Sequence, residues 1–175
     1  MLKRIRYYVA KLTRLHHSLG FGVQSPTDYS FIREVINERS DYYQHDEIGE
    51  WDDWITQKLG RLYFRIANWR QPDVIESYDY KEYLRGGCRQ ASFGRSTELI
   101  FLPIDIEGEN LLSVLDRTDD NTVLVVEGIH DGFKAKKIWH KIVEDERARV
   151  CFDLYLCGIV MFDKRRSKID YVVNF

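Results

Sequence analysis

Three acidic residues and one histidine follow strand-like segments in this sequence: Glu76, Asp105, Glu127 and His130. Ligands bind beyond the carboxyl ends of strands in an open parallel sheet, and we expect all four side chains there. Carboxylates beside an imidazole could bind a divalent metal ion or act as general acid and base. His130 and Glu127 are the candidate catalytic residues, although the four side chains could instead cap helices and hold loops.

The strands expected to position these residues are short apolar runs. Residues 122–127 are apolar on both faces, which is typical of a buried parallel strand. Helical patterns at residues 109–116 and 132–146 separate neighbouring strands, and Asp131 is expected to cap the second of these helices. The remaining strands are expected at 73–77, 98–104, 150–155, 158–162 and 168–175.

The first seventy residues favour helices. Leu2, Ile5, Val9, Leu12 and Leu15 recur at helical spacing between basic residues, which predicts an amphipathic helix within residues 1–17. It could dock on a membrane surface or a partner, or it could pack on its own domain. Helices are also predicted from Pro26 to Glu38, capped by Ser25, and over residues 51–69.

The element order therefore predicts an α/β fold, a three-layer sandwich with a helical cap. We expect residues 1–70 to form the cap and residues 71–175 the α/β core, within one compact domain.

Composition excludes several classes of protein. The formal net charge of −2 gives no strong field for nucleic acid, and no apolar run is long enough to span a bilayer. Three cysteines without a C-x-x-C pair favour a reducing compartment, and no metal site is expected. We therefore expect a cytoplasmic protein. Aromatic residues at 14% could form a stacking surface, or could pack helices on a sheet.

Residues 121–164 resemble the C-terminal part of class I S-adenosylmethionine-dependent methyltransferases, in a bacterial O-methyltransferase-like branch. The resemblance is carried by Glu127-Gly128-Ile129-His130, by Trp139, by Phe152-Asp153-Leu154 and by the run from Gly158 to Phe162. The segment from Gly20 to Pro26 is similar to the branch's Gly-aliphatic-His-Ser-Pro segment, with Gln24 in the histidine's place. The resemblance implies a Rossmann-like sheet.

The sequence departs from the family at the cofactor turn. Glu76 matches the acid that precedes the family's glycine-rich turn, but Ser77-Tyr78-Asp79-Tyr80 follows it. Residues 77–98 also leave no room for the family's second and third strands, since each parallel crossover needs a dozen residues or more. The resemblance then implies a truncated sheet of five to six mostly parallel strands in the order 1-4-5-7-6. Residues 73–77 would form an exposed edge, covered by the N-terminal helices or by a second subunit in a homodimer.

These departures predict a methyltransferase-like pseudoenzyme without a cofactor, acting as a binding or interaction module. Its partner would be a small molecule or a protein, with no nucleic acid. The alternative is a functional O-methyltransferase acting on a small molecule, with S-adenosylmethionine held by Glu76, Asp105 and Glu127. A third hypothesis is a peripheral membrane or scaffold protein that uses the basic helix within residues 1–17.

Overall fold

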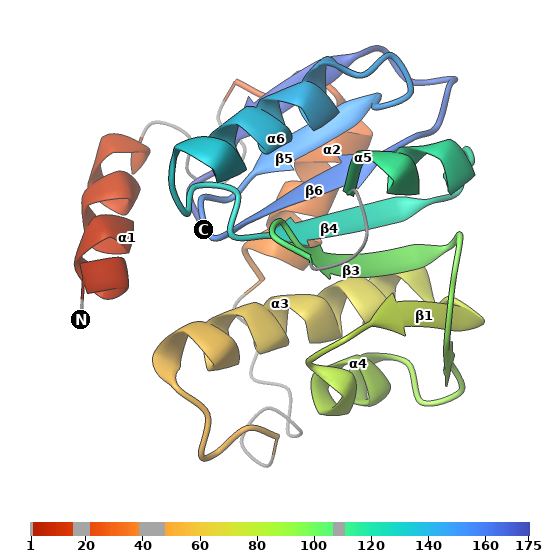
Figure 1. The fold of residues 1–175 in the computed structure, drawn as a ribbon, viewed down its shortest axis with the longest axis horizontal. Coiled ribbons are helices and arrows are strands. Elements are labelled where there is room, and N and C mark those ends of the chain that lie inside the picture. The colour runs from red at the N-terminus through yellow and green to blue at the C-terminus, as the bar shows by residue number, and fades with distance from the viewer. Residues whose placement is uncertain (1, 16–21, 39–47, 107–110) are drawn as a thin grey trace. The chain divides into compact units, whose positions relative to one another are not determined.

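The computed structural model describes residues 2–15, 22–38, 48–106 and 111–175 (Figure 1). The chain forms two compact units. The helical unit comprises residues 1–73, 78–92 and 173–175, and the sheet unit comprises residues 74–77 and 93–172.

The helical unit contains the three predicted N-terminal helices and a short fourth one. They are α1 (Leu2–Thr13), α2 (Pro26–Phe31) continued by the π-helical turn η2 (Ile32–Ile36), α3 (Trp54–Arg70) and α4 (Lys81–Gly87). Ser25 caps α2 as predicted, because its hydroxyl accepts a hydrogen bond from the Asp28 amide. Helix α3 begins later than predicted, since the Asp53 carboxylate accepts hydrogen bonds from the amides of Ile55 and Thr56.

Helix α1 packs through the face opposite to its aliphatic stripe. The aliphatic side chains are exposed, at 56% for Ile5 and 66% for Leu12, so they do not pack on the chain's own domain as one of the two alternatives expected. The buried residue is Tyr7, whose ring lies 5.0 Å from that of Trp54 and whose hydroxyl donates to the backbone oxygen of Phe175. Residues 16 and 17 of the predicted helix lie outside the described residues.

Two glycines allow α3 and α4 to approach closely. A β-carbon at Gly87 would lie 2.2 Å from the carbonyl oxygen of Phe64, and one at Gly60 would lie 2.6 Å from the Tyr83 ring. Gly86 and Gly87 are the last residues of α4. Gly60 lowers helix propensity but makes room for the neighbouring ring.

The sheet contains seven strands in the order β2-β1-β3-β4-β6-β5-β7. β1 pairs with β3, β3 with β4 and β5 with β7 in parallel, whereas β6 runs antiparallel to both β4 and β5. Their bounds are β1 (Val74–Ser77), β2 (Ser92–Phe93), β3 (Leu99–Pro103), β4 (Val123–Glu127), β5 (Val150–Asp153), β6 (Cys157–Met161) and β7 (Ile169–Val172).

The α/β class is confirmed. The expectation of five to six strands was wrong, since the sheet has seven. The sheet is mixed, but β1, β3, β4, β5 and β7 share one direction and β6 runs against them. β1 is not the exposed edge that we expected, because the two-residue strand β2 lies beside it. The amides of Ser92 and Gly94 donate to the carbonyls of Asp73 and Ile75. A Rossmann-like methyltransferase layout and the three-layer arrangement stay predictions.

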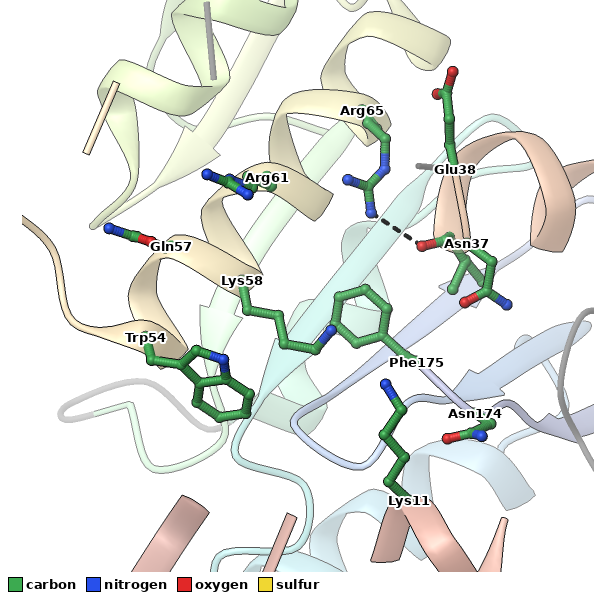
Figure 2. A pocket seen from close by; sticks show the side chains of 11 residues that line it. Lys11, Asn37, Glu38, Trp54, Gln57, Lys58, Arg61, Arg65, Asn174 and Phe175 are labelled. Carbon is green, nitrogen blue, oxygen red and sulfur yellow. Dashed lines mark hydrogen bonds between the residues drawn. The ribbon is translucent and has the colours of Figure 1, made fainter. Parts of the chain in front are cut away.

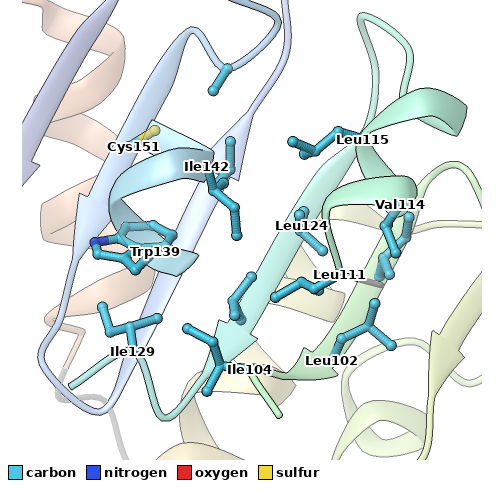
Figure 3. Close-up of a cluster of buried hydrophobic side chains, with 14 of the residues drawn as sticks. Leu102, Ile104, Leu111, Val114, Leu115, Leu124, Ile129, Trp139, Ile142 and Cys151 are labelled. Atoms are coloured by element: carbon cyan, nitrogen blue, oxygen red, sulfur yellow. The ribbon is translucent and has the colours of Figure 1, made fainter. Parts of the chain in front are cut away.

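Helices α5 (Leu111–Val114) and α6 (Phe133–Glu144) cover one face of the sheet (Figures 1 and 3). Helix α6 lies within the predicted range of residues 132–146, and its residues Ala135, Trp139 and Ile142 are in the core. The predicted cap was wrong, because α6 starts at Phe133 after Gly132 and has no side-chain cap. The core between helices and sheet includes Ile100, Leu102, Leu111, Val114, Leu115, Leu124, Val126, Cys151 and Val160.

All three cysteines are buried and carry free thiols. Within the described residues, no helix is long and apolar enough to cross a membrane.

Candidate functional site

Two of the predicted site residues lie at the carboxyl ends of β3 and β4. Pro103 of β3 lies beside Glu127 of the neighbouring strand β4. Asp105 follows Pro103 by two residues, so it lies near the same edge of the sheet. The Asp105 side chain is exposed, and Glu127 is half-buried. The amide of Ile104 donates to the backbone carbonyl of Glu127, which continues the pairing beyond the last residue of β3.

His130 is also at this edge, and Asp153 at the end of β5 holds it. The Nε2 atom of His130 lies 2.8 Å from Oδ2 of Asp153. The imidazole also stacks on the Tyr155 ring, with the ring centroids 5.0 Å apart and the planes inclined by 13°. The side chains of His130 and Asp153 are 21% and 17% exposed, so water reaches both groups.

The turns around this pair are held by backbone contacts. Gly128 has a φ of 73°, a conformation that favours glycine, and its amide donates to the carbonyl of Leu156. Tyr155 has a φ of 72°, which is uncommon for a bulky residue, and its amide donates to Oδ1 of Asp153. The Asp153 carboxylate is therefore fixed from both sides, by His130 and by the turn that follows β5.

An aspartate that holds one nitrogen of an imidazole orients the ring and selects its tautomer. A neutral imidazole that donates from Nε2 to a carboxylate carries no proton on Nδ1. A histidine oriented by a carboxylate in this way can act as a general base. Within the described residues, no group of three or more His, Cys, Asp or Glu side chains is arranged to hold a metal ion.

Glu76 does not join the other three predicted residues. Its carboxylate accepts hydrogen bonds from the Ser96 amide at 2.8 Å and from both terminal nitrogens of Arg117, at 2.7 and 2.6 Å. Ser96 precedes β3 and Arg117 precedes β4, so the Glu76 side chain extends toward the amino ends of the neighbouring strands. The four predicted residues are therefore divided between opposite ends of the sheet.

Asp153, Tyr155, Ser96 and Arg117 are the site residues that our sequence reasoning missed. An acidic residue at the end of a strand is the signal that identified Glu127, and it applies equally to Asp153. Arg117 carried no comparable signal, because its partner Glu76 is 41 residues away in the chain.

The connection between β1 and α4 consists of Tyr78, Asp79 and Tyr80, and none is a glycine. The Tyr78 side chain is 60% exposed. Tyr80 has a φ of 61°, and its ring packs edge-on against that of Tyr63, with the centroids 4.9 Å apart. The backbone of this connection does enter the left-handed region, but the residue there is Tyr80 and not a glycine.

The helical unit contains a cavity of about 400 Å³, called here the basic pocket (Figure 2). Residues of α1, η2, α3 and the C-terminal segment line it, and none of them belongs to the predicted site. Its lining includes four cationic side chains and one carboxylate: Lys11, Lys58, Arg61, Arg65 and Glu38.

No family model matches this sequence, and neither does any curated protein or solved structure.

Proposed function

We propose that this chain is a methyltransferase-like protein that does not catalyse S-adenosylmethionine-dependent methyl transfer and that acts as a binding or interaction module. The observation that carries the proposal is the engagement of Glu76 by Arg117 and Ser96. In the family that the sequence resembles, the matching acid precedes the cofactor turn. A carboxylate with both oxygens bound by one guanidinium has little capacity left for a ligand.

The connection after β1 supports the same proposal. A glycine-rich turn is needed where backbone must approach a cofactor closely, because any side chain would fill the space. Here three residues link β1 to α4, and two of them are tyrosines. Residues 78–98 add to the sheet only the two-residue strand β2, so they provide no pair of crossover strands that could hold an adenosine.

Calorimetric titration with S-adenosylmethionine and with its demethylated product tests the proposal. At ligand concentrations up to about 1 mM, which detect binding free energies stronger than about −4 kcal/mol, we expect no saturable heat. An active class I methyltransferase titrated in the same buffer serves as the positive control. Micromolar binding that Glu127→Ala weakens would overturn the proposal.

The alternative function is O-methyl transfer to a small molecule, and the His130–Asp153 pair favours it. His130 would accept the proton of the substrate hydroxyl while the oxygen forms a bond to the methyl group and the sulfur–methyl bond breaks. The test is transfer of a labelled methyl group to a panel of small alcohols, phenols and carboxylic acids. His130→Ala and Asp153→Asn should abolish any transfer, and the alternative fails if the unmodified chain labels no acceptor.

A further inference from the structure

The basic pocket concentrates positive charge in a chain whose formal net charge is −2. Lys58, Arg61 and Arg65 are spaced at three and four residues along α3, so they lie on one face of that helix. Like charges at such spacing repel one another. An anion bound among them would relieve this repulsion.

Arg65 forms a rigid part of this lining. It is 8% exposed, and its Nε and Nη2 atoms donate to the carbonyls of Val35 and Ile36 at 2.6 and 3.0 Å. These carbonyls lie at the C-terminal end of η2, where a cation interacts favourably with the helix dipole. Arg65 therefore holds η2 on α3, while Arg61, one turn earlier, is exposed.

Aromatic side chains supply an apolar part of the lining. Trp54 and Phe175 both line the basic pocket, and the Lys58 ammonium lies 3.8 Å from the centroid of the Phe175 ring (Figure 2). The rings of Trp54 and Phe175 therefore offer apolar surface to a ligand, and Lys58 offers a positive charge beside them.

Asn37 adds a hydrogen-bond donor. It follows η2 and lines the basic pocket, and its Nδ2 atom is buried without a hydrogen-bond partner among the described residues. A buried donor left unpaired is unfavourable, and an oxygen atom of a ligand would supply the missing acceptor.

From these contacts we infer that the basic pocket binds a small organic anion, with a carboxylate or phosphate group and a planar apolar body. A cavity of about 400 Å³ is in the size range of small-molecule sites. The anionic group is held by Lys58, Arg61 and Asn37, and the planar body lies against Trp54 and Phe175. This inference rests on the proposed role as a binding module and names the class of its ligand.

The test is calorimetric titration of the full chain at low salt with phenyl phosphate, benzoate and neutral benzyl alcohol. Phenyl phosphate and benzoate carry the same ring with a phosphate or a carboxylate group, which also differ in charge, so the tighter binder shows which of the two anions the pocket prefers. We expect the preferred anion to bind at least about tenfold more tightly than benzyl alcohol.

Arg61→Gln should weaken the binding of that anion by about tenfold, because it removes one charge from an exposed position without disturbing the core. Lys58→Ala combined with Arg61→Gln should weaken it further. The matched control is Arg85→Ala, which removes an exposed cation of α4 outside the pocket and should leave the affinity unchanged. Circular dichroism establishes that each variant is folded.

The inference is overturned if neither anion binds, if benzyl alcohol binds as tightly, or if folded Arg61→Gln retains full affinity. Failure here leaves the proposed loss of methyl transfer standing, since that concerns the sheet unit. Conversely, S-adenosylmethionine binding that Glu127→Ala abolishes and Arg61→Gln does not would refute only the proposed function.

Discussion

Arg117 and Glu76 form a bidentate ion pair in which the guanidinium contacts both carboxylate oxygens, and their side chains are only 15% and 12% exposed. Removing one partner of a largely buried pair leaves the other charge without compensation. We expect Arg117→Ala to lower the free energy of unfolding by about 3 kcal/mol, as measured by urea denaturation.

Arg147 provides the comparison for this prediction. It pairs with Asp145 and Asp116, but its side chain is 42% exposed. Arg147→Ala should therefore cost less than about 1 kcal/mol. Equal losses in the two variants would show that burial of the Arg117–Glu76 pair has no energetic consequence.

Gly158 in β6 is required by the ring of Trp139. A β-carbon at residue 158 would lie 2.3 Å from that ring, which is buried in the core of the sheet unit (Figure 3). Gly158→Ala should lower the free energy of unfolding by about 2–3 kcal/mol, because the indole must move within a packed core. Gly94→Ala is the control, since its β-carbon would meet nothing closer than Val74 at 4.0 Å. The steric explanation fails if thermal denaturation gives both variants the same midpoint.

The orientation of α1 can be tested by substituting its two faces. Tyr7→Ala removes a buried ring packed against Trp54 and should lower the free energy of unfolding by about 3 kcal/mol. Leu12→Ser changes a side chain that is 66% exposed and should alter stability by less than about 0.5 kcal/mol. The opposite ranking in urea denaturation would indicate that the aliphatic face packs inward, as the sequence pattern predicted.

Tyr7 also predicts a loss of stability at alkaline pH. Burial raises the pKa of Tyr7 to about 12 from its ordinary value of 10.0, and neighbouring Tyr8 adds to the shift. The unfolded chain releases this proton near pH 10 while the folded chain retains it, so this contribution is fully present below pH 10 and falls as pH rises toward 12. Tyr7→Phe should therefore lose less stability over this interval in urea denaturation. If the free energy of unfolding falls equally with pH in Tyr7→Phe and in the unmodified chain, Tyr7 is not the group responsible for the loss.

The sequence by itself predicted the α/β class and the positions of β4 and α6. These features follow from local patterns. The run from Val123 to Glu127 is apolar on both faces, and Ala135, Trp139 and Ile142 recur at helical spacing. Such patterns report which side chains of one segment are buried together, and so they locate elements without any knowledge of their partners.

Only the tertiary structure decided how distant residues are paired. Glu76 and Arg117 are 41 residues apart. Tyr7 contacts the ring of Trp54 and the backbone oxygen of Phe175, which is 168 residues away. The aliphatic stripe of α1 did not reveal that Tyr7 is the buried residue, because periodicity cannot weigh a ring contact with Trp54 or a hydrogen bond to a residue 168 positions away. Likewise, the residue type of Glu76 was visible in the sequence, but strand register and the position of Arg117 decided which way its carboxylate points.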